Sequence, residues 1–188
     1  DAWPSISWAS IDYYGNKKAF HYKLSEMYAP ILLGMDEKEN GKYNIWVSND
    51  LQRDIKGRIR VLVEDMKGNQ MFAFSEMVDI KANDCYRLPE NIKINVSKKK
   101  RTECYARIIL MEEDTVLSER LHFFAYPKDL KLVKTELEPK VTFADGKYTL
   151  EFNSKVFVKD AFVSTTEAGE FSRNFFDVLP NTPMIITF

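Results

Sequence analysis

The sequence is poor in the residues that most cofactor and metal sites require. It has two cysteines and two histidines among 188 residues, too few for a disulfide scaffold or a structural zinc site. Its seven glycines are scattered and form no glycine-rich phosphate cradle. Lys plus Arg number 27 and Asp plus Glu 28, and this balance provides no basic surface for nucleic acid or an anionic membrane. The sequence therefore predicts no cofactor, no metal, no nucleic-acid partner and no membrane partner.

Long apolar runs are also missing, since no stretch approaches the ~20 residues of a membrane-spanning helix. The chain begins at Asp1 without an initiator methionine or the basic and apolar regions of a signal peptide, so we expect a trimmed or processed chain. What the sequence does contain is 45% apolar and 13% aromatic residues, which is typical of a folded protein. At ~150 residues per domain, its length predicts one or two domains.

The few cysteines and histidines are interpreted as structural. Cys85 and Cys104 each lie in a strand-like segment, where buried free thiols are the expected state and a disulfide is the alternative. His21 and His122 have no serine or cysteine motif of a catalytic nucleophile nearby, so both are interpreted as structural or surface residues.

A helix is predicted after the Gly15-Asn16 break, and Ala29-Pro30 ends it because proline removes a backbone donor. The apolar residues that follow the i, i+4, i+7, i+8 spacing of one helical face are Phe20, Leu24, Met27 and Tyr28.

Over residues 31–127 the apolar period changes to two, which is typical of strands. The clearest alternating runs are 43–48, 58–64 and 104–111, and each is expected to offer one face to a core. Turn signals separate the runs at Asn40-Gly41, Asn49-Asp50, Lys67-Gly68-Asn69 and Glu112-Glu113-Asp114. Short strands without intervening helices predict an antiparallel sandwich.

The predicted linker is Pro127-Lys128-Asp129. Further strand-like runs follow at 130–137, 141–143, 148–152, 156–164 and 184–188. Residues 128–188 are fewer than a complete sandwich usually has, so this domain is predicted to be small or to lack its final strand. An unpaired neighbour would leave an exposed sheet edge.

Charged clusters are interpreted as solvated surface. Glu112-Glu113 and Asp36-Glu37 are expected at turns, where adjacent acids point apart, whereas glycosidase carboxylates face each other ~5–9 Å apart. The basic run 98–101 is expected in a loop, with contact to a polyanion as the alternative.

Aromatic residues gather near the start of the chain, at Trp3, Trp8, Tyr13 and Tyr14. Aromatic faces stack on the apolar face of a pyranose ring, so this cluster is compatible with sugar binding. The alternative is that these rings belong to the core of a domain whose remainder is absent.

Several segments carry a more specific pattern. They are DAWPSISWASIDYYG at 1–15, KAFHY at 18–22, YAPI at 28–31, FAYPKDLKL at 124–132 and NFFDVLP at 174–180. In this order they resemble the β-mannosidases of glycoside hydrolase family two, in which a D-x-W-P stretch closes the catalytic (β/α)8 barrel. Ala2 and Asn181 depart from the family pattern without removing the site.

The resemblance implies a parent enzyme that hydrolyses terminal non-reducing β-D-mannose residues of oligosaccharides with retention, using two glutamates. Both glutamates would lie upstream of the D-x-W-P stretch, so no catalytic residue is assigned within the chain. Trp3 matches a family tryptophan that forms an aromatic wall of the sugar pocket. Asp1 matches the acidic residue that positions this wall. The resemblance thus implies these two substrate-binding residues. It also implies a periplasmic or secreted location. The oligomeric state stays undetermined.

The predicted fold is all-β, with two immunoglobulin-like antiparallel β-sandwiches preceded by a short helical remnant of a (β/α)8 barrel. Residues 1–28 are assigned to the end of the barrel, 29–127 to the first sandwich and 128–188 to the second. The implied function is the non-catalytic C-terminal part of a retaining exo-β-mannosidase, in which the sandwiches support the barrel, their partner in cis. The alternatives are a carbohydrate-binding module, with an aromatic platform at Trp46 or at 171–176, and an immunoglobulin-like spacer.

Overall fold

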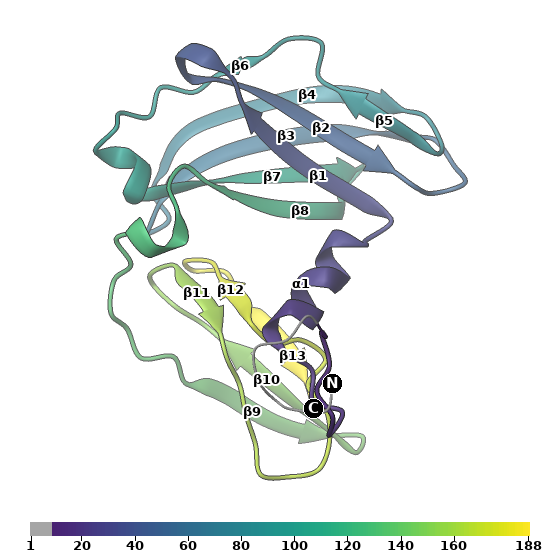
Figure 1. The fold of residues 1–188 in the computed structure, drawn as a ribbon, viewed down its shortest axis with the longest axis vertical. Helices are drawn as coiled ribbons and strands as arrows, with labels where there is room; N and C mark the ends of the chain where they lie inside the picture. Colours follow the sequence, from purple (N-terminus) through teal and green to yellow (C-terminus); the bar gives the residue numbers. More distant parts are fainter. Residues whose placement is uncertain (1–8) are drawn as a thin grey trace. The chain divides into compact units, whose positions relative to one another are not determined.

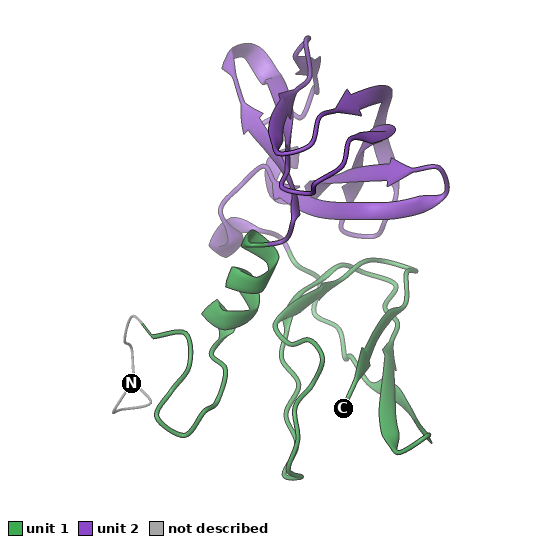
Figure 2. Ribbon diagram, turned by 90° about the vertical axis from the view of Figure 1, so that its right-hand side faces the viewer, with its two compact units in different colours: residues 1–28, 132–188 green, residues 29–131 purple. Residues whose placement is uncertain are grey.

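The computed structural model describes residues 9–188 and contains two compact units (Figures 1 and 2). One unit is Ala29–Lys131, and the other joins the described residues up to Tyr28 to Leu132–Phe188. All strand pairs are antiparallel, and the only α-helix of the described part is short. The prediction of an all-β fold with two immunoglobulin-like sandwiches is confirmed.

The first sheet of unit Ala29–Lys131 has the strand order β1-β2-β5, with β6 also paired to β2. Its strands are β1 (Ile31–Glu37), β2 (Lys42–Asn49), β5 (Asp84–Arg87) and β6 (Ile92–Lys93). Between β1 and β2, Asn40 and Gly41 have φ values of 61° and 69° in the short 3-10 turn η1 (Glu39–Gly41). Asparagine and glycine tolerate this left-handed backbone, so the turn predicted at these residues is confirmed.

The second sheet of this unit has the order β4-β3-β7-β8. Its strands are β3 (Ile55–Asp65), β4 (Gln70–Ile80), β7 (Cys104–Glu112) and β8 (Thr115–Phe123). The runs predicted at 43–48, 58–64 and 104–111 therefore lie in strands β2, β3 and β7. The turns between paired strands fall where glycine or a polar residue takes positive φ, at Gly68 and Glu113.

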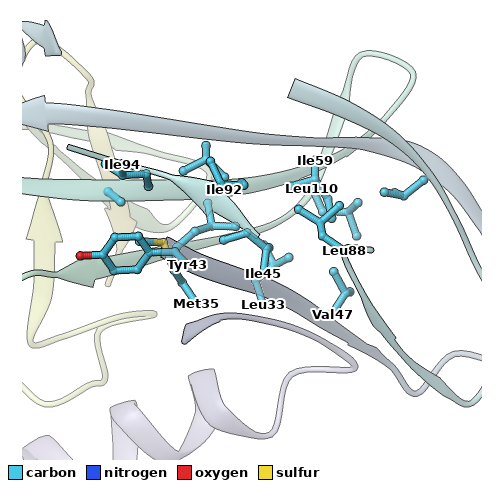
Figure 3. Packing of buried hydrophobic residues seen from close by; sticks show 14 of the residues in the cluster. Leu33, Met35, Tyr43, Ile45, Val47, Ile59, Leu88, Ile92, Ile94 and Leu110 are labelled. Carbon is cyan, nitrogen blue, oxygen red and sulfur yellow. The ribbon is translucent and has the colours of Figure 1, made fainter. Parts of the chain in front are cut away.

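The core of this unit lies between its two sheets (Figure 3). Leu33 and Ile45 of the first sheet face Ile59 and Leu110 of the second, and each is at most 2% exposed. Burying a side chain of this size stabilises the fold by about 1.5–3 kcal/mol. The period-two alternation therefore has the predicted result, because alternate side chains of each strand point into a shared core.

Strand β7 departs from the expectation of one buried face. Its residues on the side away from the core are also covered, since Tyr105 is 0% exposed and Ile109 is 5% exposed. The Tyr105 hydroxyl donates to Glu64 over 3.0 Å, and Arg107 bridges Glu64 at 3.5 Å and Glu119 at 2.7 Å. Charged side chains lie over this face of the sheet and explain why the alternation is incomplete.

The second sandwich is built from a three-stranded sheet, β13-β10-β9, and a two-stranded sheet, β11-β12. Its strands are β9 (Pro139–Ala144), β10 (Lys147–Phe152), β11 (Val158–Ala161), β12 (Phe176–Val178) and β13 (Met184–Thr187). The buried residues of its core are Leu150, Phe152, Phe176, Val178 and Ile186.

The strand predicted at 130–137 is wrong. A 3-10 turn, η3 (Pro127–Asp129), precedes this segment, which has no regular secondary structure and whose side chains are mostly exposed. Its apolar residues satisfied the sequence pattern, but none of the strands of the described chain pairs with it. A run without a hydrogen-bonding neighbour does not form a strand.

One end of the second sandwich leaves apolar side chains uncovered. The register places Val141 opposite Leu150 and Phe143 opposite Tyr148, so these side chains lie on the sheet face that carries the core. Yet Val141, Phe143 and Tyr148 are 54%, 62% and 45% exposed. The two-stranded partner sheet is too narrow to cover strand β9. That the domain lacks a final strand stays a prediction.

The predicted helix is present as α1 (Ala19–Met27), but none of its residues is buried. Phe20, Met27 and the following Tyr28 are 53%, 55% and 83% exposed. Within the same unit, Lys23 Nζ lies 3.6 Å from Asp160 Oδ1 and the Tyr22 ring 6.0 Å from that of Phe175. Of the apolar face that the sequence predicts, Leu24 is therefore partly buried and the other three residues are exposed. No helix among the described residues is long and apolar enough to cross a membrane.

Candidate functional site

The two substrate-binding residues implied by the resemblance, Trp3 and Asp1, lie outside the described residues, as does Trp8. Tyr13 and Tyr14 of the same aromatic cluster are 69% and 74% exposed, and their rings meet edge to face at 5.3 Å. This loop is held by the carboxylate of Asp12. Its Oδ1 accepts hydrogen bonds from the backbone N–H groups of Tyr14 and Asn16 at 2.9 and 2.8 Å.

The structure brings a second aromatic residue, Trp46, together with polar groups on the first sheet of unit Ala29–Lys131. Alternate residues of β2 face the core, which places Asn44 and Trp46 on the outer side of the sheet. The register sets Gly34 and Arg87 on either side of Trp46, and Asp36 opposite Asn44. We call this group the Trp46 surface; its members are Gly34, Asp36, Asn44, Trp46 and Arg87.

Gly34 gives the Trp46 ring its position. A Cβ atom on Gly34 would lie 2.1 Å from both Cε2 and Cζ2 of the ring and 2.6 Å from Nε1. The ring-fusion atom Cε2 is as near as the peripheral Cζ2, so the indole presents a face, not an edge, to the glycine backbone. Glycine is the one residue that leaves room for this contact.

Hydrogen bonds fix the edge of the ring. The Trp46 indole N–H donates to Asp36 Oδ1 over 3.1 Å, and Arg87 Nη1 donates to Asp36 Oδ2 over 3.1 Å and to Asn44 Oδ1 over 3.2 Å. Asn44 is itself anchored, since its Nδ2 donates to the backbone oxygen of Leu88 over 3.1 Å. Each side chain of the network is oriented by its neighbour.

The carboxyl group of Asp36 is held in its ionised form. Partial burial raises its pKa, but the hydrogen bonds from Trp46 and Arg87 and the charge of Lys38 outweigh this effect and bring the pKa below its ordinary value. The charges of Asp36 and Arg87 offset each other. The side chain of Arg87 is 55% exposed and that of Asp36 is 39% exposed, so both reach solvent beside the half-buried ring.

A shallow, open concavity of about 770 Å³ lies at the turn that follows Asp36. It is lined by Glu37, Lys38, Glu39, Asn40, Lys42 and Asn91. All six side chains are polar or charged. Lys38 links the concavity to the Trp46 surface, because its Nζ lies 3.9 Å from Asp36 Oδ2.

The other platform considered from sequence, residues 171–176, is used for packing. Phe176 is 2% exposed and belongs to the core, while the Phe171 ring lies 4.8 Å from that of Phe188. The ring of Phe175 lies 5.0 Å from that of Phe162. None of these rings is flanked by the charged and amide groups that surround Trp46.

The polar residues of the motif at 174–180 act on the backbone. Asn174 Oδ1 accepts from the Val163 N–H over 2.9 Å, and its Nδ2 donates to the Val163 oxygen over 2.7 Å. Asp177 Oδ1 accepts from the Asp160 N–H over 2.9 Å, at a residue whose φ is 51°. Burial raises the pKa of Asp177 despite this bond and the charge of Lys159. The hydrogen bonds of both side chains thus stabilise the backbone beside the irregularly paired strands β11 and β12.

The prediction of buried free thiols is confirmed for Cys104 and wrong for Cys85, and His122 packs among aromatic rings. The half-buried His122 ring meets those of Tyr43 and Phe124 edge to face at 5.9 and 5.3 Å, and burial lowers its pKa. Both cysteines are free, but only Cys104 is buried, whereas Cys85 is exposed on the outer side of β5. Burial raises the pKa of Cys104 to about 11.

The acidic pairs are partly corrected. Asp36-Glu37 ends strand β1 instead of lying in a turn, because the register with β2 continues to Glu37. Glu37 binds Arg101, and Glu112 is bound by both terminal nitrogens of Arg53 at 2.9 and 2.8 Å. The carboxylates of Glu37 and Glu112 are therefore both paired with arginine side chains.

Arg101 likewise departs from the solvated loop expected for the basic run, since its Nε also donates to the Phe124 oxygen over 2.9 Å. Over residues 9–188 no group of three or more His, Cys, Asp or Glu is placed to hold a metal ion.

Comparison with known proteins gives two family matches. A family described as a mannosidase Ig/CBM-like domain matches residues 41–129, and Ig_mannosidase, described as an Ig-fold domain, matches 132–188. The chain is 24% identical over 215 aligned positions to β-mannosidase A of Aspergillus fumigatus and to that of Aspergillus oryzae. Each alignment covers 100% of this chain and 22% of the relative, so the chain spans less than a quarter of these proteins.

Solved structures show the same fold. The β-D-mannosidase of Dictyoglomus thermophilum superposes with a TM-score of 0.80 at 23% identity, over 98% of this chain and 22% of that one. The exo-chitosanase CsxA of Amycolatopsis orientalis superposes with a TM-score of 0.63 at 12% identity, over 96% of this chain and 26% of that one. At these identities the likeness concerns the fold.

Proposed function

The chain belongs to the β-mannosidase-like glycoside hydrolases, as their C-terminal immunoglobulin-like region, and from this premise we propose that it is the non-catalytic C-terminal part of a retaining exo-β-mannosidase. The complete enzyme removes terminal non-reducing β-D-mannose residues from oligosaccharides. Its two catalytic glutamates lie on a barrel that precedes this chain in the sequence. The sandwiches support that barrel and take no part in the chemistry. We also propose a secreted or periplasmic location.

The observation that carries this proposal is the open apolar face of helix α1. An amphipathic helix normally buries its apolar face against a neighbouring element. Of the residues at helical spacing, Phe20 and Met27 of α1 are more than half exposed and the following Tyr28 is 83% exposed, while Leu24 is partly buried. Its contacts within its own unit involve other residues, Tyr22 and Lys23. A helix with this pattern fits a segment whose apolar face packs against a barrel.

The proposed substrate contacts come from the segment before α1. Trp3 forms an aromatic wall of the sugar pocket, because an indole face stacks on the apolar face of a pyranose. Asp1 positions that wall. Since neither residue is a proton donor or nucleophile in this proposal, both act by binding. Cleavage itself needs the two carboxylates of the barrel.

The competing interpretation, an immunoglobulin-like spacer, predicts that hydrolysis does not depend on residues 1–28. The two are distinguished in the complete enzyme that contains this chain. We expect Trp3→Ala to lower kcat/KM for an aryl β-mannoside about 100-fold, the loss of one well-placed aromatic contact. Phe20→Ser together with Met27→Ser is expected to destabilise the barrel.

The matched control is Tyr126→Ala, which removes an aromatic side chain that is 75% exposed in the first sandwich. Its activity and stability are expected to equal those of the unaltered enzyme. If Trp3→Ala and the double α1 variant behaved like Tyr126→Ala, the spacer interpretation would be correct and the proposed function would be wrong.

A further inference from the structure

We propose that the Trp46 surface binds a neutral oligosaccharide of β-linked hexopyranoses. Nothing in the similarity to known proteins assigns a ligand to these residues. The choice of a β-mannan as the natural ligand rests on the proposed function. The site itself is argued from the ring, its polar neighbours and the shape of the sheet.

The ring has the geometry of a stacking platform. One face of the Trp46 indole lies on the backbone of Gly34, where a Cβ atom would come within 2.1 Å of it. The ring therefore lies along the sheet, and its opposite face points away from the core. Tryptophan offers the largest apolar ring face of the side chains, and the C–H groups of a pyranose pack on such a face. A ring standing on edge would offer no such surface.

The groups beside the ring match the hydroxyls of a sugar. Asp36 accepts hydrogen bonds with both carboxylate oxygens, and Arg87 uses Nη1 for its described contacts, which leaves Nε and Nη2 as donors on a side chain that is 55% exposed. A sugar hydroxyl both donates and accepts, so it pairs with an adjacent carboxylate and guanidinium. The Asn44 amide holds Arg87 in place before a ligand arrives, which lowers the ordering cost of binding.

Charge and shape define the class of ligand. The Asp36 carboxylate lies 3.1 Å from Arg87 and 3.9 Å from Lys38, so its charge is compensated and a neutral ligand leaves these pairs intact. An open concavity of about 770 Å³ lies beside this surface, since its lining residue Lys38 has Nζ 3.9 Å from Asp36 Oδ2. An open face accommodates several sugar units of a chain, whereas a closed pocket would enclose one end. We therefore expect affinity to increase with the length of the oligosaccharide.

The test is calorimetric titration of the whole 188-residue chain with β-1,4-mannohexaose, and with β-1,4-cellohexaose for comparison. Loss of a stacking contact of this kind is expected to weaken binding at least ~10-fold in Trp46→Ala. Tyr126→Ala, which removes a more exposed ring elsewhere in the same unit, is expected to bind like the unaltered chain. Gly34→Ala keeps the tryptophan but displaces its ring, and is expected to weaken binding as well.

Asp36→Asn preserves the size of the side chain. It provides a second test of the site in case Trp46→Ala fails to fold. We expect it to bind more weakly while keeping its strand content by circular dichroism. No heat with either hexaose would overturn the proposal, as would unchanged affinity in Trp46→Ala or binding of a sulfated polysaccharide alone. Binding of cellohexaose without mannohexaose would support the site and count against the proposed β-mannosidase function.

Discussion

The two sandwiches differ in how completely they close around their cores. In unit Ala29–Lys131 two four-stranded sheets enclose a core cluster of 20 buried residues, whereas the second sandwich joins three strands to two and its core cluster has five, beside the buried Phe157. The first leaves no large apolar side chain of its core face as exposed as Phe143, which is 62% exposed in the second. The same period-two pattern therefore yields a closed core between two four-stranded sheets and a more open one where the facing sheet has two strands.

This difference also separates the roles of the two regions. The closed sandwich has an outer face built of oriented polar and aromatic groups, at Trp46, Asp36 and Arg87. The second unit exposes apolar side chains on the core face of β9 and on helix α1, at Val141, Phe143 and Phe20, whereas the exposed Met77 of the closed sandwich lies on an outer sheet face. In our two proposals, the apolar side chains of the second unit pack against further protein, and the Trp46 ring with its polar neighbours binds a ligand.

The largest effect is expected in the closed core. Ile59→Ala removes a side chain that is 0% exposed and should lower the free energy of unfolding by about 2–5 kcal/mol. Val141→Ala, on the core face of β9 but 54% exposed, should change it by about 0.5 kcal/mol or less. Urea titration of both variants measures the difference. An equal loss in Val141→Ala would show that the second sandwich is closed there.

A smaller effect is expected at the ring contact of the first sandwich. Gly34→Ala places a methyl group where the Trp46 ring lies, and should lower the free energy of unfolding by about 1–3 kcal/mol. The same substitution in a Trp46→Ala background should cost little, because the overlapping ring is gone. A thermodynamic double-mutant cycle gives the coupling directly. If the two substitutions were additive, the ring would not rest on Gly34.

Two aspartates, one in each sandwich, should respond to pH with opposite sign. Asp36 has a lowered pKa when folded, so its ionisation adds stability above the ordinary value of 3.8, and this is lost as pH falls through the folded pKa. Asp36→Asn should therefore cost about 0.5–1 kcal/mol at pH 7, since the group is partly screened by solvent. That cost should disappear in strong acid.

Asp177 has a raised pKa when folded, so its ionisation lowers stability once pH rises through the folded value, and the effect is absent below 3.8. Asp177→Asn keeps an oxygen that accepts the Asp160 N–H and should raise stability at pH 7 with no gain in strong acid. Chemical denaturation of both variants across this pH range checks the two signs. A loss of stability at neutral pH in both would contradict the assignment for Asp177.

The last test needs no substitution and compares the chemical reactivity of the two cysteines in the folded chain. Cys85 is exposed and should react with a thiol reagent in the folded chain, whereas Cys104 is 0% exposed with a pKa raised to about 11. The thiolate is the reactive form, so Cys104 should react only on unfolding. One fast thiol and one slow thiol are expected in an absorbance assay. Two fast thiols would mean that the first sandwich opens readily.

Much of this fold follows from local pattern. Alternation predicted β2, β3 and β7, and the positive φ tolerated by Asn40 and Gly41 predicted the first turn. The run at 130–137 was misassigned because alternation records an apolar face but not whether a neighbouring strand is available. The same limit explains Asp36-Glu37, since a strand end and a turn carry similar polar residues until the register with β2 is known.

The Trp46 surface was only partly predictable. Trp46 was a candidate from its residue type, but Gly34, Asp36 and Arg87 come from strands β1 and β5, and the antiparallel register is what makes them neighbours. The sequence signal that could have indicated this surface was a glycine in one predicted strand at a position able to pair with Trp46 in the next. For Trp3 and Asp1 the resemblance alone gives a role.

In the proposed function, catalysis requires residues outside this chain. Hydrolysis of 4-nitrophenyl β-D-mannopyranoside by purified residues 1–188, measured beside the proposed complete enzyme, tests this. We expect no turnover above the uncatalysed rate for the chain alone and clear turnover for the complete enzyme. Turnover by the chain alone at an enzyme-like rate, on the order of 1 per second, would contradict it.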